Sequence, residues 1–256
     1  MIFGPNFNSV WIGVLAFVAI FGGVLLGVLM SKRLPEQHLG SDTRTAVSVS
    51  MAVVGTLSAL VISLLISTAN SSFMARTNAI GDLAVDILRL DRSLVRYGPG
   101  ADAIRSTIHE YATAKVGELS RNRREALGLE TMRVLETVSD QITNLKPVDD
   151  RERIIQAQAL RFVEAISDAR WILLEKNSSA VPGPFLILLI FWLAILFASF
   201  GLFAPRNATA LAALFLCSVA VAGGIFMILE LASPSEGIIQ PSLKPLQTAI
   251  AQLRAD

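Results

Sequence analysis

Residues 45–97 read TAVSVSMAVVGTLSALVISLLISTANSSFMARTNAIGDLAVDILRLDRSLVRY. Residues 45–75 carry no charged side chain, and this run is longer than the roughly 20 apolar residues that cross a bilayer. At Arg76 charges begin without a Gly or Pro that would stop a helix, and a helical period continues to the breaker Gly98-Pro99-Gly100. The pattern predicts one long helix that crosses the membrane and emerges as an amphipathic rod.

Small and weakly polar residues follow one another in the membrane half of this helix at steps of three or four, so they share one face. This small-residue stripe consists of Ser48, Ala52, Gly55, Ala59, Ser63, Ser67 and Asn70. Small residues let helix backbones approach closely, so the commoner reason for such a stripe is helix–helix packing. The alternative is a water-filled pathway lined by hydroxyl groups.

The composition is that of a membrane protein. The chain has 256 residues, of which 53% are hydrophobic and 17% charged, and its mean hydropathy is +0.57. A net charge of +1 offers no electrostatic footprint for nucleic acid. The single cysteine, Cys217, excludes an intrachain disulfide and metal sites built from cysteine pairs.

Three further apolar runs are long enough to span. The first, Trp11–Met30, contains Gly23 and Gly27 in a GxxxG arrangement that suits close helix contact. Its basic residues follow the apolar core, which is the wrong order for a cleaved signal peptide, so we expect a retained helix. The third and fourth spans are expected at Phe185–Phe203 and at Ala208–Leu229, with Glu230 ending the last one.

Basic residues in the short loops predict the orientation. Lys32, Arg33 and Arg44 lie in the loop between the first two spans, and Arg206 lies in the turn between the last two. The positive-inside rule places such loops in the cytoplasm. We therefore expect a multi-pass protein of the cell inner (plasma) membrane, with residues 70–180 and both termini outside the cytoplasm.

Residues 98–180 show repeated helical periodicity and no sustained alternation. One run contains Ile104, Ile108, Tyr111 and Leu119, together with Lys115, whose stem can lie along an apolar surface. Two more helices are expected around residues 132–145 and 155–172, the latter capped by Asp149-Asp150. The Asp and Arg residues between the apolar positions are expected on the solvated faces of a bundle.

The predicted fold class is therefore an all-α integral membrane protein with four transmembrane helices and a helical domain inserted between the second and third. We divide the chain into a first transmembrane hairpin at 1–75, an extramembrane helical domain at 76–180 and a second transmembrane hairpin at 181–231. Residues 232–256 are expected to form a C-terminal amphipathic tail.

Signatures of enzymes are absent from the sequence. It contains no HExxH, GxSxG, GxGxxG or P-loop pattern, and its two histidines, His38 and His109, are predicted on opposite sides of the membrane. We expect no catalytic residue, no metal site and no cofactor. Asp82 and Asp86 share one helix face, and they are most simply part of a solvated surface. In a symmetric oligomer they could instead form acidic rings at a pore mouth, provided that Arg89 points away.

Two segments resemble the bestrophin-like family of membrane proteins, a domain of unknown function. The first is HLGSDTRTAVSVSMAVVGTLSALVISLLISTANSSF followed by RTNAIGDLAVDILRL, in which His38 and Asn78-Ala79-Ile80-Gly81 match the family pattern. The second is ILELASPSEGIIQPSLKPLQTAIAQL, in which the matching residues are Glu230, Pro234, Gly237, Ile239 and Pro245-Leu246. The family name implies kinship with bestrophins, which are pentameric anion channels with four spans per subunit and a pore lined by the second. Two features differ from bestrophins: the charges here place the helical domain outside, and an aromatic-rich neck is missing.

Two functions of different classes follow. The first is an oligomeric ion channel, a homo-tetramer or homo-pentamer in the lipid bilayer that conducts inorganic ions along the second helix. The second is a non-conducting sensor or scaffold whose helical domain binds a partner. A coupled transporter is less favoured, because such proteins usually keep a charged residue inside a span.

Overall fold

The structure is a computed structural model that describes residues 9–35, 40–121, 124–175, 182–205, 207–232 and 239–253. All regular elements within these ranges are helices. The chain divides into two compact units. The membrane unit contains residues 1–73 and 179–239, and the helical unit contains residues 74–178 and 240–256.

The long helix predicted from the opening stretch is present. Helix α2 runs from Ser41 to Tyr97 without interruption and belongs to the membrane unit in its N-terminal half and to the helical unit in its C-terminal half. It ends before Gly98, whose φ of 110° is a conformation that glycine adopts readily. Pro99 then begins the short helix η2, Pro99–Ala101.

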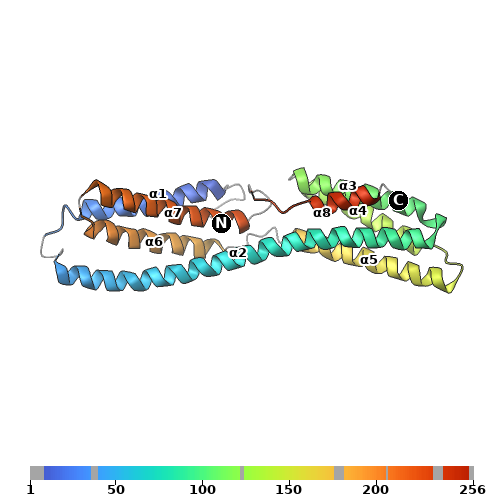
Figure 1. Cartoon of the computed structure of the whole chain (residues 1–256), viewed down its shortest axis with the longest axis horizontal. Helices are drawn as coiled ribbons and strands as arrows, with labels where there is room; N and C mark the ends of the chain where they lie inside the picture. The colour runs from blue at the N-terminus through green and yellow to red at the C-terminus, as the bar shows by residue number, and fades with distance from the viewer. Residues whose placement is uncertain are drawn as a thin grey trace. The chain divides into compact units, whose positions relative to one another are not determined.

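Four helices within the described ranges are long and apolar enough to cross a membrane, and the protein is an all-helical membrane protein. They are α1 (Ser9–Met30), α2, α6 (Gly183–Phe203) and α7 (Ala208–Ala232). In the membrane unit these helices lie side by side, with α1 packed against both α6 and α7 (Figure 1). Their shared core includes Ile20 of α1, Leu189 of α6 and Ile225 of α7, all fully buried.

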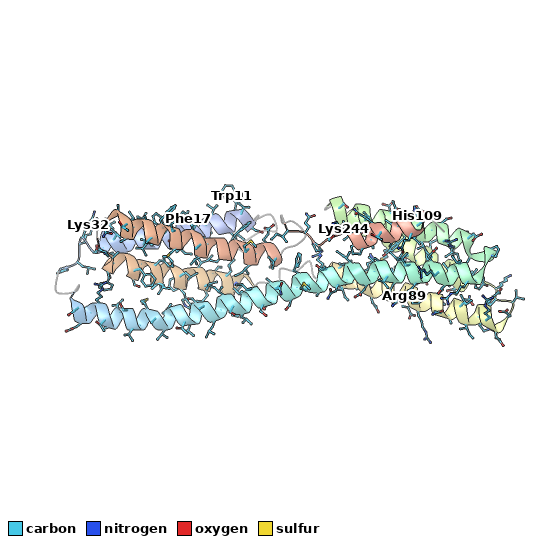
Figure 2. The ribbon with its side chains drawn as sticks, in the orientation of Figure 1. Trp11, Phe17, Lys32, Arg89, His109 and Lys244 are labelled. Atoms are coloured by element: carbon cyan, nitrogen blue, oxygen red, sulfur yellow. The ribbon has the colours of Figure 1, made fainter. Side chains whose placement is uncertain are left out.

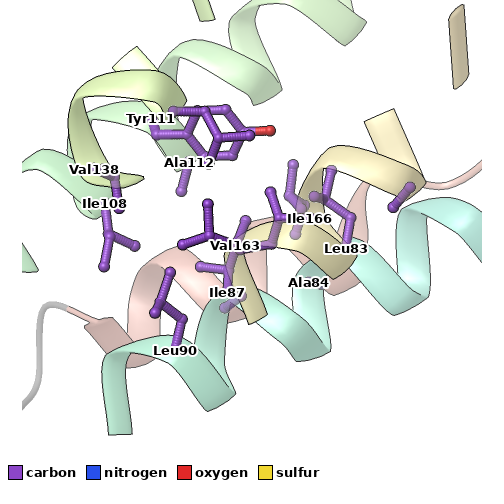
Figure 3. Close-up of a cluster of buried hydrophobic side chains, with 14 of the residues drawn as sticks. Leu83, Ala84, Ile87, Leu90, Ile108, Tyr111, Ala112, Val138, Val163 and Ile166 are labelled. Carbon is purple, nitrogen blue, oxygen red and sulfur yellow. The ribbon is translucent and has the colours of Figure 1, made fainter. Parts of the chain in front are cut away.

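The helical unit combines the C-terminal half of α2 with α3 (Asp102–Arg121), α4 (Arg124–Thr143), α5 (Asp150–Glu175) and α8 (Lys244–Leu253). Its core joins Leu83 and Ile87 of α2 to Ile108 of α3, Val138 of α4 and Ile166 of α5 (Figure 3). Apolar side chains at helical spacing on each element produce this common core, because each helix must bury one face.

The start of α5 and the C-terminal helix α8 both follow the structure that their residues predict. The Asp149 carboxylate accepts a hydrogen bond from the Glu152 backbone N–H at 2.7 Å, and the Glu152 carboxylate accepts one from the Val148 N–H at 2.8 Å. This is a reciprocal cap on α5, as the pair Asp149-Asp150 predicts. The C-terminal helix α8 contributes Leu246 and Ala249 to the core of the helical unit, where both are buried.

Candidate functional site

The small-residue stripe of α2 lies on the surface of the single chain. Six of its seven members are exposed, and the seventh, Gly55, is half-buried, with its nearest neighbour in Leu196 of α6. The exposed members are Ser48, Ala52, Ala59, Ser63, Ser67 and Asn70. Packing inside one subunit therefore does not account for the stripe. Packing against another copy and a water-filled pathway both remain consistent with it.

A different face of α2 packs against its own subunit. Ser58, Leu65 and Ala69 are buried, and at about 100° per residue the stripe lies roughly a third of a turn from them. A third face carries large apolar side chains that are exposed, including Leu60 and Leu64 at 64% each. Only 11% of the apolar window of α2 is buried, against 22% to 33% for the other spans. The second span is thus the one least covered by its own subunit.

A crevice separates α2 from α6 near the N-terminal end of α2. It encloses about 390 Å³, with Ser48, Ala52 and Gly55 on one wall and Leu196 and Phe200 on the other. Arg44 also lines it. Three of the seven stripe residues therefore border an open space rather than a packed helix contact.

The two acidic residues predicted at a pore mouth have different surroundings. Asp82 is exposed, whereas the Asp86 carboxylate is 14% exposed and pairs with the Arg89 guanidinium at 3.3 Å. Arg89 projects from α2 and is well exposed (Figure 2), but it does not point away from Asp86. From Asn70 to Asp82 the helix makes about three and a third turns, so Asp82 does not continue the line of the stripe. An acidic ring stays a prediction.

The helical unit contains buried charges. The expectation that the Arg residues of 98–180 lie on solvated faces is wrong for Arg170, which is 6% exposed. Asp91 of α2 is also buried, at 3% exposed, and pairs with Arg105 at 2.7 Å. Lys115 buries its ammonium group as well as its stem, because the Glu118 carboxylate lies 2.8 Å from it. A signal existed for Lys115 in the sequence, since it occupies an apolar position of its helical repeat.

Glu230 also differs from its expected role as the end of the fourth span. Helix α7 continues to Ala232, and Glu230 is only 1% exposed. Its carboxylate accepts a hydrogen bond from the backbone N–H of Ile239 at 3.2 Å, so the chain beyond the helix returns to cover it. A buried carboxylate that accepts a hydrogen bond from the backbone does not require contact with water.

Some predicted positions lie outside the described residues. These are His38, Arg206, Pro234 and Gly237. Among the residues that the structure describes, no group of three or more His, Cys, Asp or Glu side chains could hold a metal ion.

Comparison with known proteins gives a family and a fold. The family model described as the Bestrophin-like domain matches residues 18–246. A bacterial bestrophin homolog from Klebsiella pneumoniae, crystallised as an isoleucine-to-threonine variant, is 16% identical with a TM-score of 0.69, over 93% of this chain and 97% of that one. A structure of a membrane protein with a glycine-to-alanine change has a TM-score of 0.71 at 16% identity, over 93% of this chain and 96% of that one.

A third crystal structure, of a membrane protein with a proline-to-alanine change, has a TM-score of 0.67 at 16% identity and covers 92% of this chain and 97% of that one. No curated protein matches the sequence. At this level of identity the solved structures establish a shared fold over nearly the whole chain.

Proposed function

Because the chain belongs to the family defined by the Bestrophin-like domain, we propose that it is one subunit of an oligomeric ion channel in which the small-residue stripe of α2 faces a shared axis. The observation that carries the proposal is the exposure of six of the seven stripe residues in the single chain. Serine hydroxyls and an asparagine amide do not face lipid by preference. A second copy or water is the better neighbour for them.

A symmetric oligomer can enclose a pathway that one chain cannot enclose alone. Four spans cannot easily surround a water-filled pathway, whereas identical subunits arranged in a closed ring can do so around their axis. The large exposed side chains of α2, such as Leu60 and Leu64, lie off the stripe and suit lipid or a neighbouring subunit. We propose a homo-tetramer or homo-pentamer with α2 nearest the axis.

Charge near the extramembrane end of the pathway sets the proposed ion preference. Neutral hydroxyls select weakly, so nearby charges should dominate by concentrating counter-ions. Asp86 is compensated by Arg89, which leaves Asp82 as the stronger contributor. Since Asp82 lies off the line of the stripe, its field acts through solvent and extends only about 10 Å at 0.1 M salt. We expect a preference for cations that weakens as salt rises.

The test uses purified full-length protein. Light scattering should give four or five times the subunit mass of 27.5 kDa, and planar bilayers under a salt gradient should show current that reverses on the cation side of zero. Asp82→Asn should move the reversal potential toward the chloride potential more than Asp86→Asn does. A monomer, or a folded oligomer that passes no current, would contradict the channel and favour the sensor or scaffold.

The orientation has its own test. We propose that the helical unit lies outside the cytoplasm, because Lys32 and Arg33 lie in the short loop before α2 and Arg44 lies near the start of α2. In a Cys217→Ser background, Gly100→Cys should react with a membrane-impermeant maleimide on intact cells. Gly100 is exposed, and a Cβ there would meet only the Tyr97 ring, at 3.7 Å, so the substitution should be tolerated.

The matched control for this labelling is Ser41→Cys, at the exposed start of α2. It should stay unlabelled until the cells are lysed. The reverse pattern, with Ser41→Cys labelled on intact cells and Gly100→Cys protected, would refute the proposed orientation.

A further inference from the structure

A second crevice opens in the membrane unit, between α1 and α7, at the end that carries the loop from α1 to α2. It encloses about 350 Å³, and its walls include Val28 of α1, Leu211 and Leu214 of α7, and Pro205 of the turn between α6 and α7. No residue of α2 is among the described residues that line it. This crevice is therefore separate from the small-residue stripe.

The two polar side chains that line the crevice, Lys32 and Asn207, both offer hydrogen-bond donors. Lys32 is exposed, and no carboxylate of the described residues lies within ion-pair distance of its ammonium group. The Asn207 side-chain oxygen accepts a hydrogen bond from the Ala210 backbone N–H at 2.8 Å, which leaves the amide NH₂ to donate. The other described residues of the lining are apolar. The polar end of the crevice is therefore suited to an anionic acceptor.

The polar and apolar parts of the crevice lie at different depths in the bilayer. Helix α1 has 22 residues and is about 33 Å long, which matches the roughly 30 Å of the hydrocarbon core. Lys32 follows the end of α1 and so lies among the lipid headgroups (Figure 2). Leu214 lies six residues after Ala208, the first residue of α7, and is therefore about 9 Å deeper. The lining changes from polar to apolar with depth, as a phospholipid does.

Aromatic rings close the contact between α1 and α7 on the deeper side of the crevice. The rings of Phe21 in α1 and Phe215 in α7 meet edge to face with their centroids 5.3 Å apart, and Phe17 contacts Phe215 in the same way at 5.7 Å. Phe215 directly follows Leu214 of the lining, so these rings bound the crevice. Its volume lies at the lower end of the range for small-molecule sites, which is enough for the start of one acyl chain.

We propose that this crevice binds one anionic phospholipid from the leaflet that faces the loop between α1 and α2. The headgroup phosphate accepts hydrogen bonds from the Lys32 ammonium and the Asn207 amide, and the start of one acyl chain lies against Val28, Leu211 and Leu214. Basic pockets between transmembrane helices bind anionic lipid headgroups. A zwitterionic headgroup fits less well, because its own ammonium needs an acceptor and the described lining contains no acidic residue. The site does not require that the protein conduct ions.

The first test measures lipid binding by native mass spectrometry of the purified full-length protein. Phosphatidylglycerol and phosphatidylethanolamine with the same acyl chains are added separately, and phosphatidylglycerol should bind more tightly. Lys32→Gln should weaken its binding by about tenfold or more, because a hydrogen bond to a charged group is lost. Arg33→Gln is the matched control, since Arg33 is exposed but does not line the crevice. It should cost about fivefold at most, through the general attraction of basic residues to anionic lipid.

A second pair of variants tests the apolar part of the crevice without changing the charge. Ala208→Phe places a ring in the crevice and should also weaken the binding of phosphatidylglycerol. Ala212→Phe, at an exposed position of α7 outside the lining, should leave it unchanged. Inorganic phosphate should not displace the lipid, because it cannot occupy the apolar wall.

Equal losses in Lys32→Gln and Arg33→Gln would overturn the proposal, because they would indicate diffuse attraction to lipid. Equal binding of the two lipids, or displacement by inorganic phosphate, would overturn it as well. Electron cryo-microscopy of the unaltered protein in phosphatidylglycerol nanodiscs does not depend on whether a variant folds. It should show headgroup density beside Lys32 and chain density along Leu211. An empty crevice, or one filled by a neighbouring subunit, would refute the lipid site.

Discussion

Replacing Gly27 with alanine should prevent α1 from packing against α6. A Cβ at Gly27 would lie 2.8 Å from the Leu202 backbone nitrogen and closer still to the Ala198 carbonyl oxygen. Gly23 meets the Ala194 backbone in the same way, and Gly201 of α6 meets the Val24 backbone in return. The two helices thus touch backbone to backbone, and a backbone atom cannot move aside as the end of a side chain can.

We expect Gly27→Ala to lower stability by about 3 kcal/mol, the upper end of the usual cost of overpacking. The measurement is thermal unfolding in detergent, followed by the loss of the folded peak in size-exclusion chromatography. Gly22→Ala is the matched control, because a Cβ there has nothing within 4 Å. Alanine favours a helix over glycine by about 1 kcal/mol in both variants, so the control should be unchanged or slightly more stable. Equal midpoints for the two variants would contradict the close contact.

This contact also illustrates what the sequence could and could not predict about the fold. The spacing of Gly23 and Gly27 indicates close approach to some helix, and the lengths of the apolar runs predict the spans to within a few residues. The choice of α6 as the partner depends on Gly201 and on the shape of Ala194 and Ala198, which no periodicity reveals. Periodicity identifies which face of a helix is buried. Which other helix packs against that face depends on how the surfaces of all the helices fit together.

The same limit applies to the buried charges. Lys115 falls on the apolar repeat of its helix, so its burial could have been inferred, but its partner Glu118 could not be separated from the surface acids. Asp91 and Arg105 lie on opposite sides of the break at Gly98-Pro99-Gly100, and only the turn between α2 and α3 brings them to 2.7 Å. The burial of Asp91 is thus decided by a partner 14 residues further along the chain.

For the small-residue stripe, the sequence identifies the residues but not what surrounds them. All seven residues of the small-residue stripe were identified from spacing alone, because they lie within one uninterrupted helix. Their exposure in the subunit depends on the packing of α1, α6 and α7, which leaves most of the apolar half of α2 uncovered. The sequence could define the stripe but could not distinguish a contact within the chain from a surface of the subunit.

If that surface lines the pathway, Ser63→Leu should nearly abolish the current. Ser63 lies near the middle of the apolar run of α2, and symmetry would place four or five leucine side chains around the axis at one level. Apolar constrictions exclude water and ions from a narrow pore. We expect single-channel conductance to fall about tenfold or more while the oligomer retains its mass. Conductance in planar bilayers and light scattering on the same preparation measure both.

Ser50→Leu provides the control that separates blockage from the general effect of a larger side chain. Ser50 is also an exposed serine in the apolar part of α2, and its hydroxyl donates to the Ala46 carbonyl oxygen at 2.9 Å. It lies off the stripe, so a leucine there should face lipid or a neighbouring subunit and leave conductance within about twofold. If Ser50→Leu blocks as strongly as Ser63→Leu, the effect is not specific to the stripe. If Ser63→Leu conducts normally in a folded oligomer, the stripe is a contact between subunits and the pathway must be sought elsewhere.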